Sequence, residues 1–226
     1  MYTLVYVLCA LAQATLAVIA IRLFRAHPSL SAFMLILPIA AVVWDNSIIA
    51  LGRSIGDGPL LVGLSWPRFI GHALFTPAWI VTGIGFAWRA GAQMLGAAWV
   101  RAGQWVLYAV AVVFGFWRSV VDLRMELSTD GGLVYYRNAG TFAGPPIGSV
   151  LMLLVVLIGG VVVWRCTRRP WMVLGSLVML GAALVPTAGA GTLFDNPGEV
   201  VMAASLVLTE YLLQKRAGAG RMASRD

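Results

Sequence analysis

Charged residues are scarce in this chain. Its 226 residues include 16 Lys and Arg and 9 Asp and Glu, so 11% are charged and 60% are hydrophobic. Soluble domains carry about 25% charged residues and about 45–50% apolar ones. The shortage of charge excludes an ordinary soluble protein and an intrinsically disordered one. No polar stretch is long enough for a separate soluble domain, so residues 1–226 are predicted to form one transmembrane domain.

Several well-known motifs are also missing. The single lysine, Lys215, follows the last apolar segment, so the chain lacks the lysine that would bind retinal. There is no Asp-rich diphosphate motif, no HExxH and no P-loop, and these absences disfavour magnesium, zinc and nucleotide sites. The cysteines Cys9 and Cys166 and the histidines His27 and His72 form no metal-binding pattern. The sequence therefore predicts no metal, no cofactor and no nucleic-acid partner.

Long apolar segments dominate what is present. A transmembrane helix needs about 20 mostly apolar residues. Seven segments meet or nearly meet this length: 2–24, 30–52, 68–89, 103–117, 147–164, 171–186 and 197–213. The sequence thus predicts an all-α, multi-pass membrane protein with seven transmembrane helices, and we expect it in the plasma membrane of a bacterium.

The basic residues predict the orientation of these spans. Positive residues concentrate on the cytoplasmic side of membrane proteins. With the C-terminus inside and the N-terminus outside, the inner connections hold Arg22, Arg25, Arg89, Arg101, Arg165, Arg168, Arg169, Lys215, Arg216, Arg221 and Arg225. The outer connections hold only Arg53, Arg68, Arg118, Arg124 and Arg137. The net charge of +7 is thereby explained by topology.

One carboxylate lies well inside a predicted span. Asp45 belongs to the segment Trp44-Asp45-Asn46-Ser47, about 12 Å below the outer end of the second span. On the third span, His72 is expected about 6 Å below the outer end and Pro77 about 12 Å below it, level with Asp45. Charged residues in a bilayer are costly and often functional. Asp45 is interpreted either as a functional acid or as a tie to His72, Arg53 or Arg68 between the two helices.

A second candidate segment precedes the last span. In Phe194-Asp195-Asn196-Pro197-Gly198-Glu199, Asn196 fits a helix N-cap, Pro197 the first helical position and Glu199 the capping-box position. Asp195 is the residue that capping does not require. Aromatic-Asp-Asn occurs both here and at Trp44. Glu210, beside Lys215, is expected to be an interfacial residue that reaches toward water.

The connection 118–146 is the longest polar segment and is predicted to lie outside. It is either a lid or binding loop, or simply a solvated cap, and 133–136 within it favours a short strand. Aromatic residues are also abundant. Trp44, Phe75, Trp79 and Tyr108 fall within the predicted spans, where they either line a cavity or pack between helices.

The first two spans resemble a known family. A short first helix ends at Arg22 and Arg25, and after a Ser-containing connection comes a Met/Leu/Pro-rich helix with the pair Trp44-Asp45. This pattern is similar to that of the small seven-helix membrane terpene cyclases of fungal meroterpenoid and bacterial indole-terpenoid biosynthesis. That family has Trp-Glu at the corresponding place, whereas this chain has aspartate. Its second acid corresponds to Asp195 or Glu199.

The resemblance implies a metal-independent cyclase that protonates an epoxide or alkene of a lipophilic isoprenoid. Asp45 would be the acid, with Asp195 and His72 as further catalytic residues. The substrate-binding residues would be Trp44, Asn46, Phe75, Trp79, Tyr108 and Glu199, since aromatic faces stabilise carbocations. Two alternatives remain: a small proton-coupled transporter, and a non-enzymatic membrane protein that binds lipid or pigment.

Overall fold

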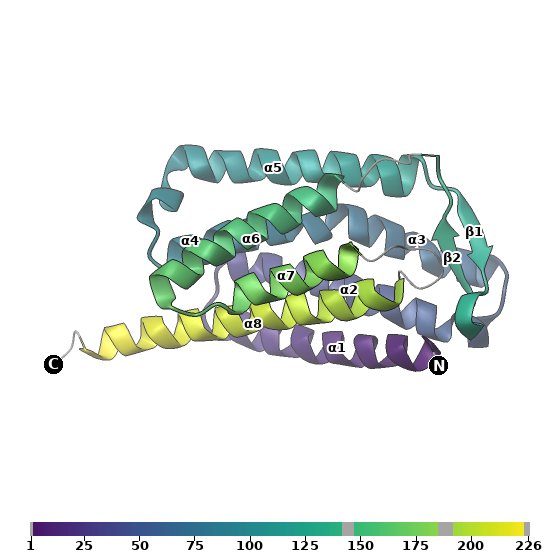
Figure 1. Cartoon of the computed structure of the whole chain (residues 1–226), viewed down its shortest axis with the longest axis horizontal. Coiled ribbons are helices and arrows are strands. Elements are labelled where there is room, and N and C mark those ends of the chain that lie inside the picture. The colour runs from purple at the N-terminus through teal and green to yellow at the C-terminus, as the bar shows by residue number, and fades with distance from the viewer. Residues whose placement is uncertain (1, 142–146, 185–191, 224–226) are drawn as a thin grey trace.

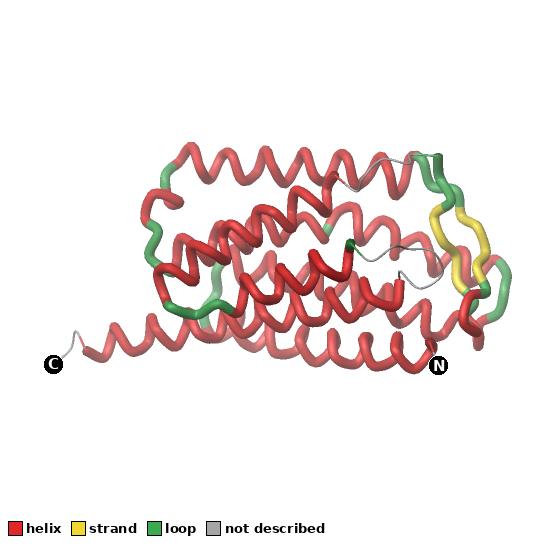
Figure 2. Tube along the Cα trace, in the orientation of Figure 1, coloured by secondary structure: helices red, strands yellow, loops and turns green. Residues whose placement is uncertain are grey.

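The fold is a bundle of helices that run along the long axis of the molecule (Figures 1 and 2). The computed structural model describes residues 2–141, 147–184 and 192–223. The long elements are α1 Tyr2–Ala26, α2 Leu30–Ile55, α3 Pro59–Leu74, α4 Trp79–Arg89, α5 Ala98–Phe116, α6 Ile147–Thr167, α7 Trp171–Ala183 and α8 Thr192–Ala223. Helix α1 packs on α2 and α8, α4 on α6, and α7 on both α6 and α8.

Short elements connect the helices. They are the 3₁₀ turns η1 Thr76–Ala78, η2 Gln93–Gly96 and η4 Asp130–Gly132, the π-helical turn η3 Trp117–Val121, and the strands β1 Met125–Ser128 and β2 Tyr135–Asn138. The predicted all-α class is confirmed, with one two-stranded antiparallel sheet added to it.

The exterior of the bundle is strongly apolar. Five helical segments in the described part of the chain are long and apolar enough to cross a membrane: Tyr2–Ala26, Leu30–Ile55, Pro59–Arg89, Ala98–Val121 and Ile147–Thr167. Large apolar side chains such as Leu8, Val113 and Ile158 are more than half exposed. Such a surface is compatible with an integral membrane protein, because lipid rather than water would cover it.

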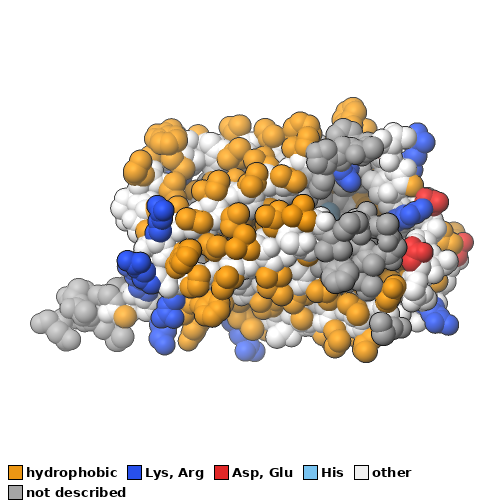
Figure 3. Space-filling model, viewed as in Figure 1, with side chains coloured by type: hydrophobic (Ala, Val, Ile, Leu, Met, Phe, Trp, Pro, Cys, Tyr) orange, Lys and Arg blue, Asp and Glu red, His pale blue; other side chains and the backbone are white. Residues whose placement is uncertain are grey.

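Charges gather at the two ends of the bundle. In Figure 3, hydrophobic side chains cover the middle of the visible face, with Lys and Arg at one end and both signs at the other. We call the second the hairpin end, because it carries β1 and β2, and the first the basic end, because it carries the α1–α2, α4–α5 and α6–α7 connections (Figure 1).

The third apolar segment is longer than predicted. Helix α3 begins at Pro59, which occupies the first helical turn after Gly58, and not at Arg68. Pro77 then interrupts the helix, because proline has no N–H and cannot continue the α-helical ladder. The chain crosses this point as η1 and resumes as α4. The Leu74 carbonyl near the break accepts a hydrogen bond of 3.0 Å from the Tyr108 hydroxyl.

The hairpin sits against the ends of α1 and α2. Leu133 and Tyr135 are buried there with Tyr6 and Ile49 in a small apolar cluster. The strand expected at 133–136 is confirmed in part, because β2 begins two residues later, at Tyr135. Its partner β1 pairs Leu127 with Tyr136.

Candidate functional site

The two aromatic-Asp-Asn segments meet in the bundle although they are 150 residues apart. The Asn196 side chain donates a hydrogen bond of 2.6 Å from Nδ2 to Oδ1 of Asn46. Asn46 is fully buried in α2 and also donates to the Val42 carbonyl of its own helix. This contact fixes the start of α8 against the middle of α2. The neighbouring acids, Asp45 and Asp195, are therefore brought to the same region.

Asp45 is held by two side chains of α3. The Arg68 Nε donates to Asp45 Oδ1 at 2.6 Å, and His72 Nε2 lies 3.6 Å from Asp45 Oδ2. Arg68 and His72 are four residues apart, so they share one face of α3 and both face α2. This is the interhelical tie that the sequence offered as an alternative to a functional acid, and Arg68 is its closest partner.

Arg68 does not lie where the sequence predicts it. It was assigned to an outer connection, yet it lies in the third turn of α3 and is 6% exposed. The physical reason is the early start of α3 at Pro59, which carries Arg68 into the bundle. Its second donor, a terminal guanidinium nitrogen, donates to the Tyr136 carbonyl of β2 at 3.1 Å. The hairpin therefore supplies a hydrogen-bond acceptor to the arginine of the buried ion pair.

A cavity of about 430 Å³ lies beside this pair, toward the hairpin end. We call it the hairpin-end cavity. It is lined by polar side chains from six elements of the structure and by apolar ones between them: His72, Thr76, Arg118, Ser119, Asn138, Ser149, Asp195, Phe69, Pro77 and Phe114. Its size falls within the range of about 300–1,000 Å³ typical of small-molecule sites. The Thr76 hydroxyl is 3.4 Å from His72 Nδ1, so the imidazole links Asp45 to the cavity wall.

The start of α8 also differs from its prediction. The helix begins at Thr192, four residues before Asn196, so Asn196, Pro197 and Glu199 lie inside the helix. The expected capping box is therefore wrong, because Asn196 uses its amide on Asn46. Glu199 therefore has no capping role, and its buried Oε2 has no hydrogen-bond partner within the described chain. Its charge interacts with those of His72, Asp45 and Asp195.

The four predicted aromatic wall residues do not line the cavity. Trp44 donates to the Leu64 carbonyl, Trp79 to the Leu35 carbonyl and Tyr108 to the Leu74 carbonyl, while Phe75 is partly exposed. These contacts fit the alternative interpretation, in which they pack between helices. The rings that line the cavity, Phe69 and Phe114, were missed. Phe69 lies between Arg68 and His72 along α3, where the helical spacing could have indicated it.

A second buried ion pair lies toward the basic end. Glu210 is fully buried and accepts two hydrogen bonds from Arg89, at 2.5 and 3.0 Å, and one from Gln214. Arg89 also donates to Ser29 and Ser31. The expectation that Glu210 reaches toward water at the interface is wrong, because Glu210 is buried and the partly buried Arg89, on α4, pairs with it.

No family model matches the chain, and no curated protein matches it. No group of three His, Cys, Asp or Glu residues suited to a metal ion was found in the described ranges.

Proposed function

We propose that this chain is a seven-span membrane protein with its N-terminus outside and its C-terminus in the cytoplasm. The apolar exterior and the gathering of cations at the basic end support this orientation. Within the described residues, Glu210 is the one acid toward the basic end, and it is buried in an ion pair. The exposed acids, Asp57, Glu126 and Asp130, and the partly buried Asp122 belong to the hairpin end, which this orientation places outside.

We further propose that the protein is a metal-independent terpene cyclase acting on a lipophilic isoprenoid. The observation that carries this proposal is the contact between Asn46 and Asn196, which gathers Asp45, His72 and Asp195 around the hairpin-end cavity. A cavity with a carboxyl group, an imidazole and two aromatic rings offers acid, base and cation-stabilising groups together. Isoprenoid cyclisation by protonation requires these three kinds of group.

Asp195 is the group best placed to deliver the proton. It lines the cavity, whereas Asp45 does not, and both Asp45 oxygens already face Arg68 and His72. In this mechanism the Asp195 carboxyl protonates an epoxide oxygen or a terminal alkene carbon. An internal alkene attacks the resulting cation and closes a ring beside Phe69 and Phe114.

The reaction ends when a proton leaves the last cation. His72 lines the same cavity and accepts that proton in this scheme. One proton is added and one is lost, so substrate and product are isomers. Asp45 serves as a positioning residue, because it holds the His72 ring from the side opposite Thr76.

The experiment is conversion of an epoxidised or unmodified polyprenyl substrate by membranes that contain the protein. Asp195→Asn is expected to lower turnover by about 10²–10⁴-fold, the usual contribution of a general acid. Glu126→Gln is the matched control, because it changes an exposed carboxylate to an amide on the hairpin surface. Cyclic product formed at the wild-type rate by Asp195→Asn would contradict the proposal.

A proton-coupled carrier is the second candidate. It is favoured by the titratable groups gathered at the hairpin-end cavity, where His72 and Asp195 line the wall and Asp45 lies 3.6 Å from His72 Nε2. This alternative predicts substrate flux driven by a pH gradient in proteoliposomes, with no change in the substrate. A cyclase instead releases an isomer and needs no gradient.

A further inference from the structure

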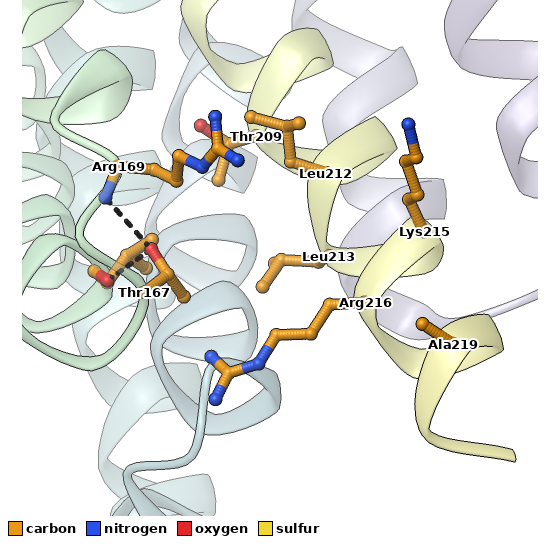
Figure 4. Close-up of a pocket in the computed structure, with 9 residues that line it drawn as sticks. Thr167, Arg169, Thr209, Leu212, Leu213, Lys215, Arg216 and Ala219 are labelled. Carbon is orange, nitrogen blue, oxygen red and sulfur yellow. Dashed lines mark hydrogen bonds between the residues drawn. The ribbon is translucent and has the colours of Figure 1, made fainter. Parts of the chain in front are cut away.

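A separate pocket opens at the basic end of the molecule, far along the bundle from the hairpin. It has a volume of about 290 Å³ and lies between the end of α6, the α6–α7 connection and the last turns of α8 (Figure 4). We call it the basic-end pocket. Three cations line it, Arg169, Lys215 and Arg216, together with an apolar wall that includes Val163, Leu212 and Leu213.

The charge of this pocket is not balanced by any acid among the described residues that line it, since none of them is Asp or Glu. No hydrogen bond or ion pair engages the Arg169 guanidinium or the Lys215 ammonium within the described ranges of the chain. The Arg169 and Lys215 charges therefore face water or a ligand.

Arg216 is held in position by the backbone. Its guanidinium donates to the Ala90 carbonyl at 3.3 Å and to the Cys166 carbonyl at 3.2 Å. Figure 4 shows Arg216 extending from α8 and Arg169 extending toward α8 from the α6–α7 connection. The two guanidinium groups thus approach the pocket from opposite sides, on separate elements. A planar guanidinium matches the geometry of phosphate oxygens better than a lysine ammonium does.

We propose that the basic-end pocket binds the phosphate of an anionic phospholipid. Basic pockets between transmembrane helices on the cytoplasmic side are suited to such headgroups. A soluble phosphate would need the cations alone, whereas the pocket also presents buried apolar side chains, Val163 and Leu213. A lipid satisfies both features, with its phosphate on Arg169 and Arg216 and its glycerol and acyl carbons along that wall.

The test is native mass spectrometry of the delipidated full chain with phosphatidylglycerol, phosphatidylcholine or inorganic phosphate. Phosphatidylglycerol is expected to form adducts more readily than phosphatidylcholine. Arg169→Gln is expected to lower phosphatidylglycerol binding about fivefold, the effect of one interfacial cation. Arg169 is chosen because its side chain has no partner in the described structure, so the substitution leaves the fold intact.

Arg165→Gln is the matched control, because it removes one charge from the same end without lining the pocket. Equal losses in both variants would overturn the proposal and indicate diffuse charge attraction. Displacement of phosphatidylglycerol by millimolar inorganic phosphate would overturn it in favour of a soluble anion. The experiment measures lipid binding and not turnover, so its result can be interpreted even if the cyclase proposal fails.

Discussion

The bundle contains two buried ion pairs, and they differ in how completely their hydrogen bonds are satisfied. Glu210 accepts three hydrogen bonds, and its partner Arg89 has two further serine acceptors. Asp45 accepts one short bond from Arg68, and its second oxygen faces a histidine at 3.6 Å. The first pair is a closed structural network. The second pair is connected through His72 to a cavity lined by a further acid, Asp195, as expected for a functional site.

The largest expected effect concerns the closed pair. Glu210→Gln places an amide N–H₂ against guanidinium donors and leaves Arg89 without a counterion, so we expect a loss of about 3–5 kcal/mol in the free energy of unfolding. Turnover per folded molecule should not change. Thermal and denaturant unfolding in detergent measure the first quantity. Glu126→Gln, at an exposed pair with Arg137, should cost less than about 1 kcal/mol.

The second effect concerns the pair beside the cavity. Asp45 accepts one hydrogen bond where Glu210 accepts three, and Asp45→Asn keeps an oxygen that can accept that bond from Arg68, so we expect a smaller loss of about 1.5–3 kcal/mol. Turnover should fall by at least about tenfold, because the His72 ring loses the carboxylate that orients it. Kinetics at matched folded concentration separate the two quantities. If stability falls and turnover is unchanged, Asp45 is only a structural tie.

A third, smaller effect tests the contact that gathers the site. Asn196→Ala leaves the buried Asn46 oxygen without its donor, which should cost about 1–3 kcal/mol. A double-mutant cycle with Asn46→Ala should give a coupling energy of about 0.5–3 kcal/mol. Additive losses would mean that the two amides do not interact in the membrane.

The smallest effect is a pH dependence at the hairpin surface. The Tyr136 hydroxyl donates a 2.5 Å hydrogen bond to Asp57 Oδ1, and this bond raises the pKa of Tyr136 above its usual value of 10.0. A raised pKa in the folded state means that the contact is complete below pH 10 and is lost as the pH rises through the higher value. Ultraviolet difference titration of the wild type against Tyr136→Phe should show this tyrosine titrating late. Asp57→Asn should return it to the ordinary range.

Hydropathy predicted much of the fold because lipid contact selects apolar residues over whole helices. The bounds of α1, α2 and α6 follow the apolar runs closely. The prediction places Arg68 at the end of a span because it is charged, whereas Gly58-Pro59 begins the helix nine residues earlier. Ion pairing with Asp45 offsets part of the cost of burying that charge, and hydropathy contains no information about pairing.

The sequence does not indicate which distant residues pair with one another in the bundle. Arg89 and Glu210 are 121 residues apart, and each was interpreted as an interfacial residue when considered alone. The repeated aromatic-Asp-Asn sequence did mark two segments that meet, at Asn46 and Asn196. Phe114 could not be separated from other aromatics, because the shape of the cavity depends on how seven elements pack together.

The Arg68 guanidinium connects the hairpin to the interior of the bundle. It holds Asp45 with one nitrogen and the Tyr136 carbonyl of β2 with another. Separation of the hairpin from α3 would leave a buried Arg68 donor without its acceptor. The hairpin is therefore expected to move together with α2 and α3. A ligand on the exposed side of the hairpin would therefore reach the geometry around His72 through Arg68 and Asp45.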